Sequence, residues 1–478
     1  MSEGTASEGT MGEGTASGEI VLVREGAYHD SVRLMRVSRA LAAVPGVEAA
    51  MVAMGTELNV AVLRDLGFTV PAAGPGDLLV AVRAADPGAA VAEADRLLGA
   101  LDRPGDPAGG TAGGTAGGTA GQPPRTAGSA IRRGDAGLVL VSVPGEHAFC
   151  EAHDAVLAGL PVMIFSDGVP VALERRLKEL AEERDVLVMG PDCGTASIGG
   201  VGLGFANVLA PGPVGVVAAS GTGAQQVASL LDWAGVGVSH ILGVGGRDLS
   251  DEVGGLSTLR ALRLLEADPA TELIVLLSKP PAPRVARAVE AAAAGLRKPV
   301  VRALLGPGAP DLTAAAESAL RALGRAVPVW PSWPGRPSRG AKKALKGLYS
   351  GGTLSAEAAL VAGPMAGRGD FVDYGDDAYT RGRAHPMIDP TLRVAALAGA
   401  AETDVVLMDV VLGHAADPDP AATLAPAVAA SPATVVVALV GTRSDPQDPH
   451  RQATALHRAG AAVFLSNAQA ARHARSLL

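Results

Sequence analysis

The chain has 478 residues, of which 48% are apolar and only 3% aromatic, and its formal net charge is −9 at pH 7. This length exceeds what one core supports and predicts about three domains whose cores consist of Ala, Val and Leu. The mild charge, without a basic stripe, argues against a nucleic-acid partner. The two cysteines lack metal-type spacing and fit a reducing compartment, so we expect no metal site. No apolar run could span a bilayer and no export signal occurs, so we expect a cytoplasmic protein.

Two tracts of low complexity interrupt the sequence. Residues 1–18 repeat small and acidic residues, and residues 104–128 contain the run AGGTAGGTAGGTAG. Neither tract has enough apolar residues to form a core, so we expect a disordered tail and a flexible insertion that carry no chemistry.

Short apolar runs alternate with helical patterns through the rest of the chain. The first are Ile20–Val23 and a helix from about residue 30, and residues 137–210 repeat the alternation. Strands that alternate with helices predict βαβ units and parallel sheets. We therefore predict an α/β fold of three Rossmann- or flavodoxin-like doubly wound modules. The expected boundaries are 19–210 with the insertion at 104–128, then 213–325, a Pro- and Gly-rich connector at 326–343, and 344–478.

A glycine-rich turn follows the apolar run Val214–Val217. It reads Ser220-Gly221-Thr222-Gly223, and helical spacing begins again at Val227. This is the pattern of a buried strand, a turn and a helix. Free N–H groups and the positive end of the helix dipole favour an anion there, so residues 220–222 are candidate phosphate ligands. The alternative is a helix start that caps itself and binds nothing.

A second turn of this kind follows the apolar run that ends at Val411. It contains Gly413, His414 and Ala415, and His414 would lie at the mouth of a pocket. On this motif alone, a solvent-facing turn histidine is the preferred interpretation.

The polar loop 373–390 has neither helical nor strand periodicity. It gathers Asp376, Arg381, Arg383 and His385, together with Tyr, Met and Ile side chains that can fix it in place. Carboxylate, guanidinium and imidazole together could bind an acidic substrate and move protons. The alternative is an Asp–Arg network that merely fixes the loop.

A tight turn at Gly190, Pro191, Asp192 and Cys193 follows another apolar run. Cys193 could act as a nucleophile, but no histidine neighbours it in sequence. A cysteine that lines a pocket is therefore the preferred interpretation.

At these motifs the chain resembles the succinyl-CoA synthetase superfamily, and within it the FdrA family. The segments VSVPGEHAFCEAHDAVLAGLPVMIFSDGVP and VLVMGPDCGT are similar to the CoA-binding domain of the α-subunit, and GPVGVVAASGTGAQQ with GVGGRDLSDEVGG is similar to its ligase domain. The segment from GLYSGGTLSAEAA to VVVALVGTRSDPQDP resembles the C-terminal domain of the β-subunit. FdrA proteins share this fusion, as well as REGAYHDSVRLMRVSRAL and YGDDAYTRGRAHPMIDPTLR.

The resemblance implies a pocket in which two helix N-termini point at one phosphate. The residues that match the family's site fall into four groups. These are Ser220, Gly221 and Thr222 at one helix start; Gly413, His414 and Ala415 at the other; Ser350, Gly351 and Gly352 near the substrate; and Gly190, Pro191, Asp192 and Cys193 between the CoA thiol and the phosphate.

Two departures from the superfamily limit what the chain can do alone. Residues 298–313, KPVVRALLGPGAPDLT, lack the histidine that the synthetases phosphorylate. No segment between residues 325 and 345 is large enough for their ATP-grasp nucleotide domain. A complete ATP-driven cycle through a phosphohistidine is therefore not expected of this chain.

The resemblance implies a carbamoyltransferase subunit of the oxamate type, from allantoin and purine catabolism, that works with partner subunits. Carbamoyl phosphate would be the donor and a small carboxylate the acceptor, with His385, Asp376 and Arg383 as catalytic residues and Arg381 on the substrate. The alternative is an acyl-CoA ligase whose partner supplies the nucleotide, which would make CoA the one candidate cofactor. A third reading is a non-enzymatic sensor of CoA or phosphate. We expect an oligomer in each case.

Overall fold

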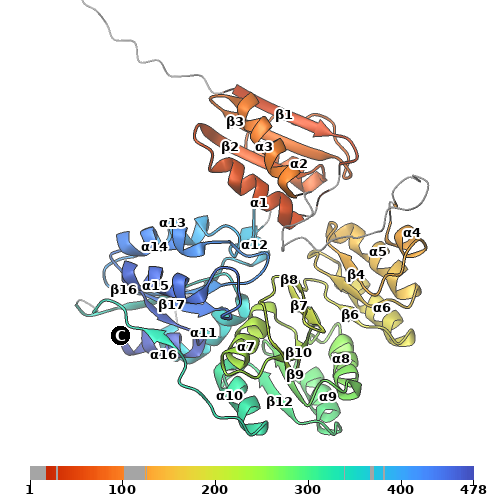
Figure 1. Ribbon diagram of the computed structural model, residues 1–478, viewed down its shortest axis with the longest axis vertical. Coiled ribbons are helices and arrows are strands. Elements are labelled where there is room, and N and C mark those ends of the chain that lie inside the picture. Colours follow the sequence, from red (N-terminus) through yellow and green to blue (C-terminus); the bar gives the residue numbers. More distant parts are fainter. Residues whose placement is uncertain are drawn as a thin grey trace, which may run out of the picture. The chain divides into compact units, whose positions relative to one another are not determined.

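The computed structural model describes residues 18–27, 29, 31–101, 124, 126–337, 340–366, 371–380 and 383–478. The predicted tail and most of the predicted insertion lie outside these ranges, as does Arg381. The chain forms two compact units, Met1–Ala112 and Gly113–Leu478, and each is described by itself (Figure 1).

The first unit is a small antiparallel α/β structure. Its sheet has the order β1-β3-β2, and every neighbouring pair is antiparallel. One face of the sheet packs on the first and third helices through Leu34, Leu41 and Leu98, and the second helix covers the other face through Leu63. Its elements are β1 (Gly18–Arg24), α1 (Ser31–Ala42), β2 (Val47–Met54), α2 (Glu57–Asp65), β3 (Leu78–Ala84) and α3 (Pro87–Leu101).

This unit differs from the parallel module that we expected to continue from residue 19 to residue 210. Alternation of strands and helices along a sequence does not give the direction of the strands. The structure thus separates residues 18–101 from the parallel sheet that follows.

The second unit begins with a three-stranded sheet of order β4-β5-β6 in which all neighbours are parallel. Apolar side chains of two helices, among them Ala152, Val156 and Leu177, pack against the buried strand residues Val162 and Ile164. The elements are α4 (Ala127–Ile131), β4 (Val139–Val141), α5 (Gly145–Leu157), β5 (Val162–Ile164), α6 (Val171–Glu183) and β6 (Val188–Met189).

The next sheet has the order β12-β11-β9-β10-β7-β8. Its strands β9 to β12 are parallel, and an antiparallel hairpin extends one side. Strand β11 is buried along its whole length, which explains its run of Leu, Ile and Val. The elements are β7 (Thr195–Ile198), β8 (Val201–Gly204), β9 (Pro211–Ala218), α7 (Gly221–Trp233), β10 (Val238–Gly243), α8 (Leu256–Ala267), β11 (Leu273–Ser278), α9 (Pro283–Ala294), β12 (Val300–Leu304) and α10 (Leu312–Ala322).

The last sheet has the order β13-β18-β17-β16-β14-β15 and is parallel except for β13. That short strand lies in the predicted connector and pairs with β18. The elements are β13 (Ser332–Trp333), β14 (Ala344–Tyr349), α11 (Gly352–Ala362), a 3₁₀ turn (Gly363–Ala366), β15 (Phe371–Asp373), α12 (Asp377–Thr380), α13 (Thr391–Ala398), β16 (Asp404–Val411), α14 (Pro420–Ala430), β17 (Thr434–Val440), α15 (Pro449–Ala459), β18 (Ala462–Phe464) and α16 (Asn467–Ser476). The predicted α/β class with several parallel-sheet modules is confirmed.

Helix α7 joins the last two sheets, and Figure 1 shows it next to α11. The Gln226 side chain donates to Leu465 O at 3.0 Å and accepts from Asn467 N at 2.9 Å. At the other end of the helix, Trp233 Nε1 donates to Gly441 O at 2.8 Å. Because these polar atoms are buried and paired, they fix how the two sheets meet.

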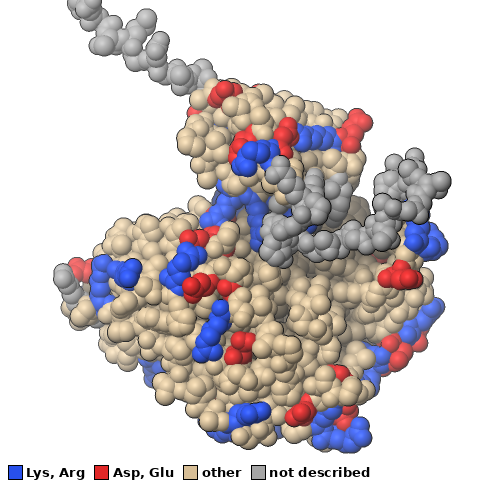
Figure 2. Space-filling view, viewed as in Figure 1, with Lys and Arg blue, Asp and Glu red and all other residues tan. Residues whose placement is uncertain are grey.

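Basic and acidic side chains are interspersed among larger uncharged areas on the face of the second unit drawn in Figure 2. That face therefore has no single basic or acidic patch. No helix in the described part of the chain combines the length and the apolarity that a membrane crossing requires.

Candidate functional site

A small cavity lies where the parallel strands of the last two sheets end. Its volume is about 160 Å³. Residues that follow the strands β9, β10, β11, β14 and β15 contribute to it, in the position where α/β sheets bind ligands. The lining residues that carry the argument are Asp192, Cys193, Ser220, Gly221, Thr222, Gln225, Lys279, Gly351, Gly352, Thr353, Asp373 and His385.

Two helix N-termini meet at this cavity, those of α7 and α11. Ser220 is the N-cap of α7, where its Oγ accepts from Gly223 N at 3.1 Å and its hydroxyl donates to Thr353 Oγ1 at 2.6 Å. Gly351 allows the close approach, because a Cβ at this position would lie 2.5 Å from Thr222 Oγ1. The positive ends of both helix dipoles and their free N–H groups thus favour an anion in the cavity.

A buried ion pair holds the start of α11. The carboxylate of Asp409 accepts from the N–H and the hydroxyl of Ser350, both at 2.8 Å, and from Arg393 Nη1 at 2.9 Å. Arg393 also donates to Pro386 O at 3.3 Å. The pair therefore fixes the turn before α11 together with the segment that carries His385.

His385 lies in the cavity as a neutral imidazole. Its Nδ1 accepts from Met387 N at 3.2 Å, which leaves the proton on Nε2. Burial, assisted by the positive charge of Arg393, lowers the pKa of His385 to about 4. The ring is tilted against Phe205, with centroids 5.3 Å apart. At neutral pH this histidine can donate a hydrogen bond from Nε2 but does not carry a charge.

Asp192 is the lining carboxyl whose proton affinity is raised most clearly. Its side chain keeps contact with solvent at the cavity mouth, yet desolvation and the nearby carboxylates of Asp167 and Asp377 raise its pKa to about 6. Lys279 and Arg247 oppose this shift. A carboxylate with this pKa is suited to accept a proton near neutral pH.

Cys193 lines the cavity as a buried residue. Burial raises the pKa of its thiol to about 12, and its Sγ donates to Thr195 O at 3.5 Å. A thiol with this pKa stays protonated at neutral pH, which favours the role of a lining residue over that of a nucleophile.

The turn at 413–415 does not line the cavity. Gly413 N donates to Gln447 Oε1 at 3.1 Å, and His414 N donates to Ala206 O at 2.7 Å. Because these two N–H groups already have partners, they are not free to bind a phosphate, whereas the α11 start lies at the cavity; phosphate binding at 413–415 stays a prediction.

The predicted catalytic set is brought together only in part. Asp376 Oδ1 accepts from Ala378 N at 2.9 Å within its own loop, and Arg383 is exposed; neither lines the cavity. Arg381 lies outside the described residues. Among the described members of that set, His385 alone lines the cavity.

Lys279, Gln225 and Thr353 line the cavity but were not among the predicted site residues, whereas Asp373 is the first residue of the predicted polar loop. Lys279 had a local signal, since a lysine that ends a pure apolar strand and precedes Pro280 is placed where ligands bind. Gln225 follows Thr222 by three residues on the same helix, which is a local signal as well. Thr353 had none, because its proximity to Ser220 depends on the contact between the two sheets.

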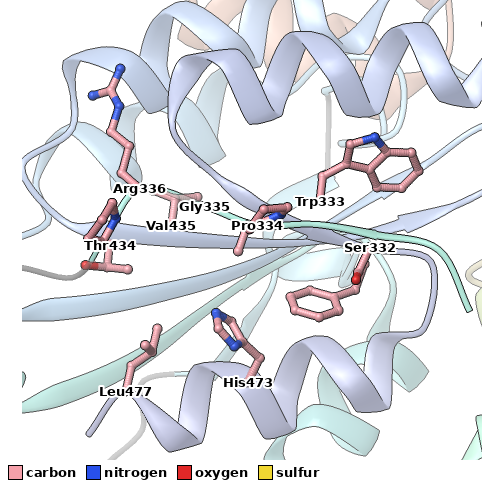
Figure 3. A pocket seen from close by; sticks show the side chains of 12 residues that line it. Ser332, Trp333, Pro334, Gly335, Arg336, Thr434, Val435, His473 and Leu477 are labelled. Carbon is pink, nitrogen blue, oxygen red and sulfur yellow. The ribbon is translucent and has the colours of Figure 1, made fainter.

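A larger cavity of about 320 Å³ lies elsewhere in the second unit, between the connector, β17, β18 and α16. Figure 3 shows His473 on α16 across this cavity from Pro334 and Trp333. Its lining includes no residue of the α7 or α11 starts, so it offers no equivalent anion site.

The fold and this site define a CoA-ligase-like α/β protein. Residues 348–477 match the CoA-ligase family profile, and residues 18–114 match one described as "AllF, heavy metal-associated domain". The chain is 35% identical to "Uncharacterized protein YahF" of Escherichia coli, covering 96% of this chain and 98% of YahF. It belongs to the family of YahF. The predicted resemblance to the succinyl-CoA synthetase superfamily is thus confirmed, and the FdrA assignment stays a prediction.

Two ligase subunits show a more restricted similarity. The chain is 33% identical to the α-subunit 2 of succinate–CoA ligase (ADP-forming) of Archaeoglobus fulgidus, over 31% of this chain and 52% of that subunit. It is 34% identical to the α-subunit of malate–CoA ligase of Methylorubrum extorquens, over 34% of this chain and 55% of that subunit. The chain spans about half the length of these two subunits.

The donor set of residues 18–114 does not fit the heavy metal in the name of their profile. The segment contains no cysteine and a single histidine, His29. Among the residues described by the structure, no group of three His, Cys, Asp or Glu side chains could hold a metal ion. Soft metals prefer thiolate and imidazole ligands, so we assign no metal chemistry to this unit.

Proposed function

We propose that this chain is the acyl-transferring subunit of a CoA-ligase-like enzyme. It would hold an acyl phosphate between the starts of α7 and α11 and transfer the acyl group to the thiol of CoA. The observation that supports this most is the hydrogen bond from Ser220 Oγ to Thr353 Oγ1 at 2.6 Å, which brings two helix N-termini to one cavity. A cavity of about 160 Å³ is small beside the roughly 300 Å³ or more of drug-sized sites, which suits a small acyl phosphate.

The proposed chemistry assigns different roles to the two titratable groups. The thiol sulfur attacks the acyl carbon, a C–S bond forms, and the C–O bond to phosphate breaks with the electron pair leaving on phosphate. Asp192, whose pKa is about 6, takes the thiol proton as a general base. The Nε2–H of His385 donates to the acyl oxygen as negative charge develops there. The environment raises the pKa of Asp192 and lowers that of His385, and such opposite shifts are typical of sites in which one group accepts a proton and another donates a hydrogen bond.

A partner chain would supply the nucleotide chemistry. The ligases that match this chain are themselves α-subunits, and the segment that resembles the β-subunit lacks the nucleotide domain. Formation of the acyl phosphate from ATP is therefore assigned to a partner, and transfer from a preformed acyl phosphate to this chain.

Carbamoyl transfer is a second candidate, because one buried atom favours an acyl group that bears N–H donors. Asn207 Nδ2 donates to Asp445 Oδ2 at 2.7 Å, so Asn207 Oδ1 faces Gln225 Nε2 at 3.2 Å. Gln225 Oε1 is then left without a hydrogen-bond partner among the described residues, although it is buried and Gln225 lines the cavity. Such an acceptor could bind the amide of carbamoyl phosphate.

A panel of donors and acceptors tests both candidates. Acetyl, succinyl and carbamoyl phosphate are each mixed with CoA or with oxamate, and thioester, oxalurate and phosphate are measured. We expect thioester formation that falls about 10- to 100-fold in Thr222→Val, because a hydroxyl donor to a charged group is lost. Thr69→Val, in the other unit, is the matched control. Carbamoyl transfer without any thioester would favour the second candidate, and no turnover with any pair would support a non-enzymatic sensor.

A further inference from the structure

Lys279 is the one permanent positive charge among the described residues that line the cavity. Two carboxyl groups that also line the cavity, those of Asp192 and Asp373, carry negative charge when ionised. The helix starts contribute only about half a charge each. A doubly charged acyl phosphate would therefore meet net repulsion without this lysine.

The ammonium of Lys279 is available to a ligand. Within the ranges that the structure describes, it forms no hydrogen bond or ion pair, and its side chain is exposed at the end of β11. Four other lysines of this unit have side-chain partners: Lys178 donates to Glu174 and Asp248, Lys298 to Leu265 O, Lys342 to Glu402 O, and Lys346 pairs with Asp404. Its charge acts on the nearby carboxyl groups of Asp192 and Asp373 and opposes their raised pKa values. An ammonium without a hydrogen-bonded partner beside the start of α11 can bind an anion.

The backbone fixes where this ammonium lies. Pro280 and Pro281 follow directly, which restricts Lys279 to extended backbone and sets the direction in which the chain leaves the strand. At the start of α11, a Cβ on Gly352 would lie 2.8 Å from Lys279 Nζ and would also contact Asp373 Oδ2. The glycine thus leaves open the space between the ammonium and the helix start.

We infer that Lys279 is the anion-binding residue of this site and contacts the phosphate of the acyl phosphate at the start of α11. This inference rests on the proposed function, since it names the residue that recognises the substrate's charge. The ligand is an anion with a phosphate group, and the helix N–H groups bind the phosphate oxygens that Lys279 does not reach.

Calorimetric titration of the full chain with acetyl phosphate, and separately with inorganic phosphate, tests the inference. We expect Lys279→Met to weaken both affinities about 10- to 100-fold, because a charge-assisted hydrogen bond is lost, and Lys279→Arg to restore part of the loss. Lys343→Met, an exposed lysine outside the lining, is the control and should bind like wild type. Thermal melting checks that each variant is folded.

The pH dependence of binding is a second readout, and it reports whether the charge of Lys279 lies near Asp192. Lys279 lowers the pKa of Asp192, so its removal should move the titration of Asp192 to higher pH. Acetyl phosphate binding that is equal in wild type and folded Lys279→Met would overturn the inference and leave the proposed function standing. Failure of the wild-type chain to bind either ligand would instead refute the proposed function and this inference with it.

Discussion

Replacement of Lys178 by Met tests whether a buried ion cluster holds the glycine turn that lines the cavity. Lys178 Nζ donates to Glu174 Oε1 and Asp248 Oδ1, both at 2.8 Å, and to Val244 O at 3.0 Å. All three charged residues are at most 2% exposed. The cluster joins α6 of the first parallel sheet to residues 244–248, and Gly245 in this turn lines the cavity.

The structure sets the size of the effect. Removing one partner from a buried ion pair costs about 3–5 kcal/mol, because the other charge is left uncompensated. Arg247 Nη2 remains 3.0 Å from Glu174 Oε2, and Asp248 still accepts from Ser257 and Thr258. The remaining partners place the expected loss at the lower end, about 3 kcal/mol.

Native-state hydrogen exchange of residues 244–255 measures this loss locally, where a multidomain chain does not unfold in one step. A loss of about 3 kcal/mol corresponds to exchange about 100-fold faster through local opening. Arg176→Met, on the same helix but paired only with Glu179 at 3.9 Å at the surface, should change exchange little. Unchanged exchange in Lys178→Met would refute the reasoning that this cluster holds the turn.

Three further predictions concern the cavity itself. If Asp192 is the base, the wild-type rate of thioester formation rises through about pH 6. Asp192→Asn should abolish this rise, and an unaltered pH–rate profile would exclude the role. The pKa of His385 is about 4 in the folded chain and about 6.5 when unfolded. The neutral histidine therefore contributes fully to stability above pH 6.5, and this contribution is lost as the pH falls toward 4. Urea unfolding across this range should be less pH-dependent in His385→Gln, and an equal dependence would contradict the assignment. Gln225→Leu should reduce the preference for carbamoyl over acetyl phosphate about 10-fold in competition assays, because only the amide can donate to Oε1, and a preference that persists would remove the support for carbamoyl transfer.

The sequence predicts the parallel modules well because their strands are buried on both faces. Strand β16 is buried at every position, and its run of Val, Leu and Met admits few alternatives to a central strand. The first unit could not be predicted in the same way. Strand β1 is only partly buried, and nothing local shows that it pairs with β3 in the antiparallel direction.

The site was predictable where its signal was local. The glycines and hydroxyls of residues 220–223 predict an anion-binding helix start from the sequence alone, and Ser220, Gly221 and Thr222 line the cavity. Its partner at Thr353 is 133 residues away in the chain, so only the packing of α7 on α11 identifies it. The turn at Gly413 has the same local pattern, but contacts with Gln447 and Ala206 use its N–H groups.

A crystal structure of the full chain grown with inorganic phosphate would show directly whether an anion binds between the starts of α7 and α11. We expect phosphate in the cavity, within hydrogen-bond distance of the N–H groups of residues 221–222 and 352–353 and of Lys279 Nζ. Phosphate bound instead at the turn 413–415, with the cavity left to water, would contradict it.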